Sequence, residues 1–284
     1  MPDLVKVESI AMTTKIVIVV QARMSSSRLP GKVLLPILGK SLLYRMIERL
    51  GMISHHAQVV IATSEDETDD VIETEARQMN IACYRGSMNN LLDRHYQAAK
   101  HLGARIVLKI PSDCPLIDPV IIDQALDFYF AHPGEYDYVS NLHPATFPDG
   151  NDVEIMTMGC LERTWKEAKR SLELEHTTPY IWENPEKFNI GNVIWDTGLD
   201  YSMSHRFTID YEADYQFIKR VYEELYPTKP GFFCEDILDL LEENPEIYNI
   251  NAEYVGVNWY RNHLNELKTI SPGQTKLVID KNYI

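Results

Sequence analysis

Short apolar runs alternate with amphipathic stretches along the chain from residue 15 onward. The run 16–20 is entirely apolar and has the length of a buried strand. In the stretch 41–50, apolar residues such as Leu43, Met46 and Leu50 recur at helical spacing. Strands that alternate with helices are typical of βαβ units. The pattern therefore predicts an α/β protein with a mainly parallel sheet.

The same criteria predict the other elements. Strands are predicted at 15–20, 58–62, 81–84, 105–110, 152–158, 187–195 and 206–209, and helices at 41–50, 66–79, 89–102, 159–170, 174–183 and 211–225. A further helix begins at Asp118-Pro119, where an N-cap residue precedes proline. Ligands of parallel sheets bind beyond the carboxyl ends of the strands. The loops 21–32, 63–65 and 111–115 are therefore predicted to share one site.

Composition narrows the class of protein. The chain has 284 residues, 45% of them hydrophobic, and a formal net charge of −15. This acidic balance argues against a nucleic-acid partner, which would require a basic surface. A mean hydropathy of −0.25 and short apolar runs exclude a spanning helix, so no membrane partner is expected. Four scattered cysteines, and an N-terminal stretch without an apolar signal core, favour a cytoplasmic protein.

The segment 21–32, Gln-Ala-Arg-Met-Ser-Ser-Ser-Arg-Leu-Pro-Gly-Lys, is the most informative part of the chain. It follows a predicted strand and combines Arg23, Arg28 and Lys32 with three serines, with no acidic residue inside it or in the ten residues on either side. A loop with small residues, available backbone N–H groups and fixed cations is typical of a polyphosphate-binding site. A surface loop with solvated cations is the alternative, but the combination favours phosphate binding.

Two aspartates are candidate metal ligands. Asp113 follows a predicted buried strand, and the next helix already has a separate cap in Asp118. Asp113 is therefore available for Mg²⁺, a hard cation that prefers carboxylate, water and phosphate oxygens. Asp210 lies between a predicted strand and a predicted helix, where a helix cap and a metal ligand are equally consistent with the spacing.

Two further sets of polar residues have a role that the spacing leaves open. Arg85 and the neighbours Asp93 and Arg94 fit the lining of a cleft near a base or ribose. Asp93 and Arg94 equally fit an ion pair on a helix surface. His176 fits a contact with a sugar or a carboxylate, although a single histidine before a proline is more often structural.

Several motifs together resemble a known family. QARMSSSRLPGK (21–32), PSDCPLI (111–117) and RFTIDYEADYQFI (206–218), in this order, are similar to the spore-coat polysaccharide cytidylyltransferases of the SpsF type. RGSMNNLLDRHYQAA (85–99) and PDGNDVEIMT (148–157) fit the same pattern, and a more distant similarity extends to the CMP-Kdo and CMP-sialate synthetases. SSRLPGK is nearer the Kdo type and indicates CTP. The resemblance covers about residues 15–225.

The resemblance implies a fold, a reaction and a set of site residues. The fold is a three-layer Rossmann-like α/β sandwich, the nucleotide-diphospho-sugar transferase fold. In the reaction, which uses CTP and Mg²⁺, the hydroxyl of an acidic sugar attacks the α-phosphate, releases pyrophosphate and forms a CMP-sugar for a surface polysaccharide or glycan. The implied nucleotide-binding residues are Gln21, Ala22, Arg23, Ser25, Ser26, Ser27, Arg28, Lys32, Thr63, Arg85, Ser112 and Asp113. Arg23, Lys32 and Asp113 are the expected catalytic residues, and Asp113 and Asp210 the expected metal ligands.

Sugar recognition and assembly follow less directly. We expect Asp152, Glu154 and His176 to face the substrate, but the residues that bind the sugar carboxylate in the Kdo type do not align with this chain, so the sugar stays open. The nucleotidyltransferase domain is expected at 15–240, with 140–205 as an insertion, lid or dimer arm. Outside it, 1–14 is expected to be a tail and 241–284 a C-terminal extension. A homodimer is expected, because the synthetases that the chain resembles are commonly dimers.

Two other functions fit the same motifs. One is a nucleotidyltransferase of this fold that uses another nucleotide or a non-sugar acceptor. The other is a non-catalytic nucleotide-binding subunit. Both candidate metal aspartates and all three loop cations are present, and this favours an enzyme.

Overall fold

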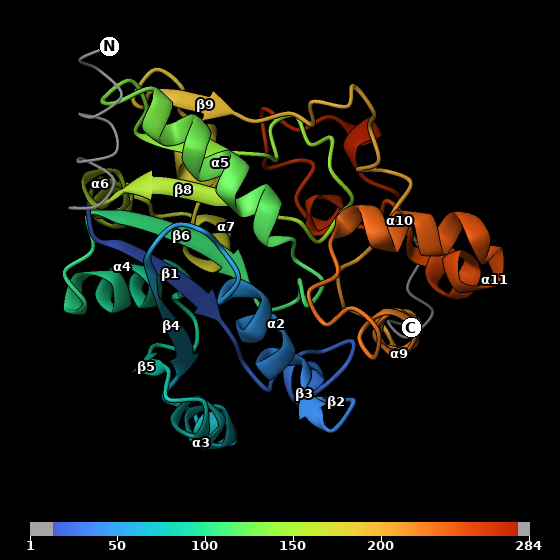
Figure 1. The fold of residues 1–284 in the computed structure, drawn as a ribbon. Helices are drawn as coiled ribbons and strands as arrows, with labels where there is room; N and C mark the ends of the chain where they lie inside the picture. The colour runs from blue at the N-terminus through green and yellow to red at the C-terminus, as the bar shows by residue number, and fades with distance from the viewer. Residues whose placement is uncertain (1–13, 278–284) are drawn as a thin grey trace, which may run out of the picture.

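A seven-stranded sheet forms the centre of the molecule in the computed structural model, which describes residues 14–277 (Figure 1). Its strands are β1 (Ile16–Gln21), β4 (Ala57–Ser64), β5 (Ala82–Gly86), β6 (Ile106–Pro111), β7 (Tyr138–Ser140), β8 (Glu154–Thr157) and β9 (Ile190–Asn192). They lie in the order β5-β4-β1-β6-β8-β7-β9. Strand β8 is antiparallel to both of its neighbours, and the other pairs are parallel. The prediction of a mainly parallel sheet is confirmed.

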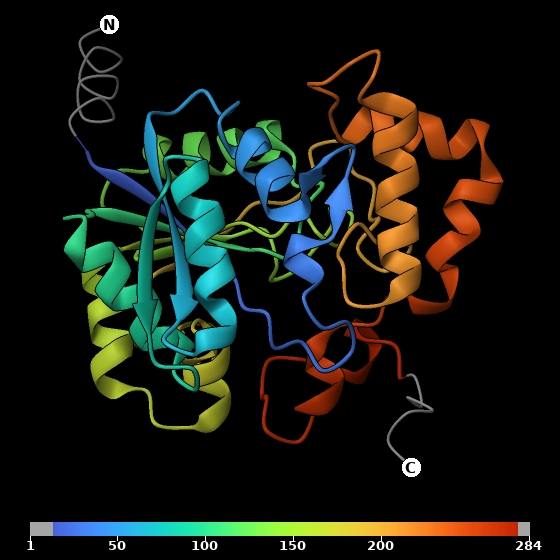
Figure 2. The same cartoon turned by 90° about the horizontal axis from the view of Figure 1, so that it is seen from below.

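Helices cover both faces of this sheet and complete a three-layer sandwich (Figures 1 and 2). One face packs against α2 (Leu42–Leu50), α3 (Asp70–Gln78) and α5 (Pro119–Ala131). The other packs against α4 (Leu91–His101), α6 (Met158–Glu167), α7 (Ser171–His176) and α8 (Pro179–Trp182). Helices α9 (Glu212–Leu225), α10 (Cys234–Glu243) and α11 (Pro245–Tyr248) form a group beside the sheet. A small hairpin, β2 (Pro36–Ile37) and β3 (Lys40–Ser41), precedes α2.

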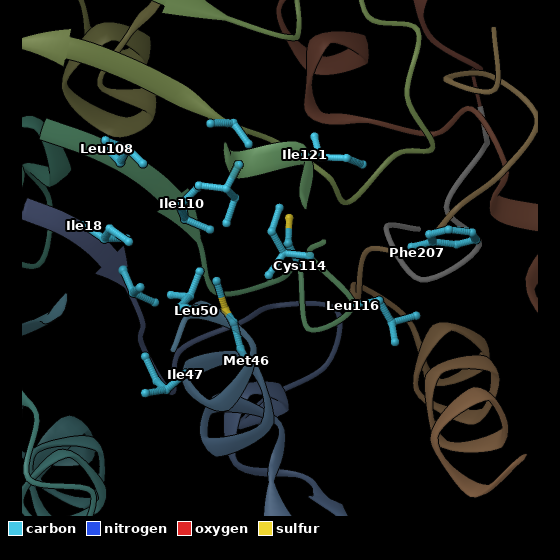
Figure 3. Packing of buried hydrophobic residues seen from close by; sticks show 14 of the residues in the cluster. Ile18, Met46, Ile47, Leu50, Leu108, Ile110, Cys114, Leu116, Ile121 and Phe207 are labelled. Atoms are coloured by element: carbon cyan, nitrogen blue, oxygen red, sulfur yellow. The ribbon is translucent and has the colours of Figure 1, made fainter. Parts of the chain in front are cut away.

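Each face of the sheet has its own hydrophobic core, because side chains alternate along a strand. In β1, Ile18 points into the core beneath α2 and α5, whereas Val17 and Val19 point into the core beneath α4. Figure 3 shows the first core, where Ile18 and Leu108 from the strands lie near the side chains of α2. Burial on both faces explains why these strands are continuous apolar runs in the sequence.

Local signals set most element boundaries, and two predicted elements are wrong. Asp118 caps α5 as predicted, since its Oδ1 accepts a hydrogen bond of 2.8 Å from the backbone N–H of Val120. The predicted helix 174–183 is interrupted at Thr177, which has a φ of 73°, and resumes at Pro179. The predicted strand 206–209 is reduced to a single bridge between Asp149 and Arg206. Strand β7, in contrast, was not among the predicted elements.

The region 140–205 is part of the main sandwich, since it supplies β8, β9 and the helices α6 to α8. After α11, the expected C-terminal extension contains short 3-10 turns at Asn249–Tyr254, Trp259–Asn262 and Pro272–Gln274. Of the expected tail 1–14, residues 1–13 lie outside the described part of the chain. Within 14–277, no helix has the length and apolar character needed to cross a membrane.

Candidate active site

A cleft of about 1170 Å³ opens beyond the carboxyl ends of β1 and β6. Most of the predicted site residues line it, although they come from segments far apart in the sequence. These are Gln21, Ala22, Arg23, Ser26, Ser27, Arg28, Lys32, Ser112, Asp113, Asp152, Glu154, His176 and Asp210. The fold therefore brings the cationic loop, both candidate metal aspartates and the three candidate substrate residues into one space.

The cationic loop after β1 is fixed by hydrogen bonds to Asp69, a fully buried residue that precedes α3. One oxygen of Asp69 accepts a 2.7 Å hydrogen bond from the backbone N–H of Met24. The other accepts from the backbone N–H and the hydroxyl of Ser64, at the end of β4. At the far side of the loop, Gly31 adopts a φ of 70° and its N–H donates back to the carbonyl of Met24. These contacts fix the loop across the ends of two strands.

Two loop cations converge on Asp210. Arg28 donates to Oδ1 of Asp210 at 2.6 Å, and Lys32 Nζ donates to the same oxygen at 2.9 Å. Lys32 also lies 3.7 Å from Oδ2 of Asp113 and donates to the carbonyl of Ile209. Lys32 therefore lies between the two predicted metal aspartates, which places the phosphate-binding and metal-binding candidates in contact.

Asp210 does not cap the helix that follows it, so this alternative is wrong. Helix α9 begins at Glu212, and Asp214 accepts the backbone N–H groups of Asp210 and Tyr211 at 2.9 and 3.0 Å. The carboxylate of Asp210 instead meets Lys32, Arg28 and a third cation, Arg206. Burial opposes its ionisation, but these three cations outweigh burial and hold the pKa of Asp210 well below its usual value.

Arg206 is the buried support of this arrangement. Its side chain is 1% exposed, and its guanidinium binds Asp214 at 2.8 Å, Asp149 at 3.2 Å and the carbonyl of Val257 at 2.6 Å. The guanidinium thereby joins the start of α9, the loop after β7 and the C-terminal segment. Because five N–H donors are fixed in one plane, an arginine can hold several partners in a defined geometry.

The donor set fits a magnesium ion shared with phosphate oxygens. Among residues 14–277, no three Asp, Glu, His or Cys side chains converge as a complete protein site for a metal. Mg²⁺ is usually bound by one or two carboxylates together with water and substrate phosphates. Asp113 suits this role, because its side chain is 35% exposed and its cationic neighbour is 3.7 Å away. Asp210 lies beside it but is engaged by cations on both oxygens.

The far end of the cleft contains a buried ion pair. Lys109, in the middle of β6, binds Glu154 in the facing position of β8. The hydroxyl of Tyr138 donates to the second oxygen of Glu154 at 2.6 Å. Although Glu154 is 2% exposed, the pKa of its carboxyl is lowered, because Lys109 outweighs the effect of burial. Asp152 lies nearby, and burial and then Asp113 raise the pKa of its carboxyl to about 6.

Aromatic rings from the C-terminal extension close this end of the cleft. The ring of Trp259 stacks on His176 with centroids 3.8 Å apart and an interplanar angle of 12°. Tyr260 lies near His143, whose ring also contacts Trp182 at 4.6 Å. All five of these residues line the cleft. Burial, followed by the neighbouring His263, lowers the pKa of His176 to about 3, so this ring is neutral at pH 7.

Three predicted nucleotide-binding residues do not line the cleft. Arg85 is turned toward Asp70 and Glu73 of α3, which it meets at 2.5 and 3.0 Å. Thr63 is fully buried within β4. Ser25 is exposed, and its hydroxyl contacts the sulfur of Met88. Their positions are explained by the pleat of β4 and β5 and by the course of the loop, which sequence spacing alone does not define.

Several residues that shape the cleft were not among the predicted site residues. Lys109 interrupts an otherwise apolar strand, and a lysine in a buried strand indicates a partner of opposite charge. Arg206 opens the motif that contains Asp210, whereas Asp69 and Trp259 carry no distinctive local pattern. Their roles depend on partners far away along the chain.

The fold and the cleft are those of an α/β protein with a ligand site at the carboxyl edge of a mainly parallel sheet. A sequence profile of the cytidylyltransferase family matches residues 17–247, and the chain belongs to this family. The expected resemblance and the expected fold are thereby confirmed.

Individual relatives agree with this assignment. The chain is 28% identical to spore coat polysaccharide biosynthesis protein SpsF of Bacillus subtilis, over 81% of this chain and 95% of that protein. It is 31% identical to 8-amino-3,8-dideoxy-manno-octulosonate cytidylyltransferase of Shewanella frigidimarina, over 43% of this chain and 51% of that protein. The structure of a cytidylyltransferase from Leptospira borgpetersenii matches with a TM-score of 0.78 and 34% identity, over 83% of this chain and 97% of that one.

Proposed function

We propose that this protein transfers CMP from CTP to a hydroxyl group of an acidic sugar, with release of pyrophosphate, for the synthesis of a surface polysaccharide or glycan. The observation that supports it best is the convergence of Arg28 and Lys32 on Asp210, next to Asp113, at the carboxyl ends of parallel strands. SpsF and the octulosonate cytidylyltransferase, named for polysaccharide synthesis and for an acidic sugar, support the acceptor class.

Nucleotide binding is proposed to exchange ion pairs. In the structure, Arg28 and Lys32 both form ion pairs with Asp210. A triphosphate is a strong, multiply charged acceptor that competes for both cations, and arginine can bind two of its oxygens at once. Release of Asp210 from these cations leaves two adjacent carboxylates, Asp113 and Asp210, for a cation. When bound there, Mg²⁺ would neutralise phosphate charge and orient the reacting groups.

The chemical step needs positioning more than a covalent nucleophile. The oxygen of the acceptor hydroxyl forms a new bond to the α-phosphorus of CTP and loses its proton to solvent. The bond from that phosphorus to the bridging oxygen of the pyrophosphate breaks, and pyrophosphate leaves. Lys32 and Arg28 are placed to hold the negative charge that develops on the leaving pyrophosphate. The aromatic end of the cleft, with Trp259, Tyr260 and His176, is the proposed acceptor subsite.

Nucleotide identity is tested with CTP, UTP, ATP and GTP. Each is added with Mg²⁺ to the protein in a thermal unfolding assay, and CTP is expected to give the largest rise in the unfolding temperature. A larger rise with another nucleotide favours the alternative of a different nucleotidyltransferase. A metal-dependent rise with CTP, followed by no turnover with any acceptor, favours a non-catalytic subunit.

The reaction is tested by pyrophosphate release from CTP and Mg²⁺ with 3-deoxy-manno-octulosonate and its 8-amino derivative as acceptors. Asp113→Asn is expected to lower the rate by roughly 100-fold or more, because the metal loses a charged ligand. Asp239→Asn, on the exposed side of α10, is the matched control and is expected to leave the rate unchanged. An unchanged rate in Asp113→Asn contradicts the metal role.

A cytoplasmic location and a homodimer are also part of the proposal. Light scattering of the purified protein tests the homodimer.

A further inference from the structure

Arg94 is a buried arginine of the cleft wall whose guanidinium lacks partners. It lies in the second turn of α4, is 2% exposed, and lines the cleft. Among the residues of 14–277, neither its Nε nor its Nη1 has a hydrogen-bond partner. Every other buried arginine of this chain, such as Arg49 and Arg206, donates to carbonyl or carboxylate oxygens.

The acidic residues near Arg94 are engaged elsewhere. Asp93, its neighbour in sequence, faces the other way and accepts from the indole N–H of Trp165 at 2.8 Å and from Gln97. A surface ion pair between Asp93 and Arg94 is therefore wrong. Asp69 is the other acidic neighbour, but its two oxygens already accept from the backbone N–H groups of Met24 and Ser64.

A second cation lies close to Arg94. Arg23 of the loop lines the same cleft and forms no ion pair within the described part of the chain. Burial, and then the proximity of Arg23, lowers the pKa of Arg94 to about 10, so its guanidinium is still charged at pH 7. Arg28 and Lys32, in contrast, both form ion pairs with Asp210. Arg23 and Arg94 therefore differ from Arg28 and Lys32, because neither forms an ion pair among residues 14–277.

The backbone makes room for this side chain. A Cβ atom at Gly86, the last residue of β5, would lie 3.1 Å from Cγ of Arg94 and 3.0 Å from a ring carbon of Tyr84. The stem of Arg94 therefore packs against the end of β5, which fixes its course into the cleft. A buried charge without a partner is costly, so a position that holds one is expected to meet its counter-charge in a ligand.

We propose that Arg94, together with Arg23, forms a second anion subsite of the cleft that binds a phosphate group of the nucleotide. The planar fork of the guanidinium suits two phosphate oxygens, and the two unpartnered N–H groups are the donors for them. This subsite rests on the proposed function, because it takes CTP as the natural ligand. It acts from α4, whereas Arg28 and Lys32 act from the loop.

Calorimetric titration of the full chain tests the subsite with CTP and Mg²⁺, with inorganic pyrophosphate, and with cytidine, which has no phosphate. Arg94→Met is expected to bind CTP or pyrophosphate at least tenfold more weakly, with no change for cytidine. Its unfolding temperature without ligand is expected to be equal to or above that of the wild type, because an uncompensated charge is removed. Arg77→Met, an exposed change on α3, is the control and is expected to change no affinity.

The outcomes separate the subsite from the proposed function. If Arg94→Met binds CTP and pyrophosphate as the wild type does, or loses cytidine equally, the subsite is refuted while the proposed function stands. If the wild type binds pyrophosphate but not CTP and Arg94→Met loses that binding, the anion subsite stands and the proposed function fails. A wild type that binds none of these ligands overturns both. Arg94→Lys, which keeps the charge, covers the case in which the methionine variant does not fold, and is expected to bind severalfold more weakly.

Discussion

The imidazole of His95 lies beneath the cleft in a place where it must remain neutral. It is 1% exposed, and its Nδ1 lies 2.9 Å from the carbonyl of Leu91 one turn earlier in α4. The charged groups that face it are Lys109 of β6, Arg94 of α4 and Glu154 of β8. Burial lowers the pKa of His95 most. The carbonyl of Leu91 raises this pKa and the two cations lower it, so that the pKa falls to about 3. Between about pH 3 and pH 6.5, His95 is therefore protonated in the unfolded chain but not in the folded one.

The cost to stability follows from this pKa. An unfolded chain binds a proton at His95 below about pH 6.5, whereas the folded chain binds it only near pH 3. The contribution of the neutral His95 to the free energy of unfolding is therefore fully present above pH 6.5 and is lost as the pH falls toward 3. Integrated from pH 7 to pH 5, this difference lowers the free energy of unfolding by about 2 kcal/mol.

Urea unfolding at pH 7 and pH 5, followed by circular dichroism, measures the effect. Between these two pH values the free energy of unfolding is expected to fall by about 2 kcal/mol less in His95→Gln than in the wild type. His101→Gln, at the exposed end of the same helix, is the control and is expected to fall as the wild type does. An equal fall in His95→Gln and the wild type would refute the assignment of a buried neutral imidazole.

Three further variants test the packing and the acceptor end. Glu154→Gln leaves the charge of Lys109 buried without a counter-ion, so a loss of about 3–5 kcal/mol in urea unfolding is expected, and a loss below 1 kcal/mol contradicts the pairing. Gly150→Ala places a Cβ 2.7 Å from the carbonyl carbon of Phe207 at a φ of 103°. It is expected to lower the free energy of unfolding more than Gly103→Ala, where no atom lies within 4 Å of the added Cβ. Equal losses count against this close approach. Trp259→Ala is expected to raise the KM for the acceptor severalfold in the pyrophosphate assay with unchanged CTP affinity, and a parallel loss of CTP affinity argues against an acceptor role.

The fold could be predicted where local signals agree with the tertiary structure. The apolar run that forms β1 and the cap at Asp118 depend on neighbours within a few residues, so spacing identifies them. The break between α7 and α8 was missed because apolar periodicity continues across it. Pro179 has no N–H to donate to the preceding turn, so the chain breaks at Thr177 and Pro179 begins a new helix at its first position.

The limits are different for the site. The cationic loop and Asp113 follow strands, and their position at the carboxyl edge is a consequence of the parallel sheet. Lys109 was overlooked because a buried lysine needs a partner of opposite charge. That partner, Glu154, lies 45 residues away in β8, the strand that pairs antiparallel with β6. The free donors of Arg94 are likewise a property of the packed structure. A sequence shows which charges exist but does not show which of them are neutralised.

One end of the cleft is completed by a segment that lies outside the family match. Arg23, Arg28, Lys32 and Asp113 lie inside the part that matches the cytidylyltransferase family, residues 17–247. Trp259 lies outside that part, in a segment held to the body by Arg206 through Val257 and by the carboxylate of Glu183, which accepts from the backbone of Lys268 and Thr269. Arg206 also contacts Asp210, so the segment that closes the proposed acceptor end is linked to the residue that binds the loop cations. The proposed acceptor wall therefore depends in part on a segment outside the family match, and substitutions in this segment are expected to change acceptor use before nucleotide use.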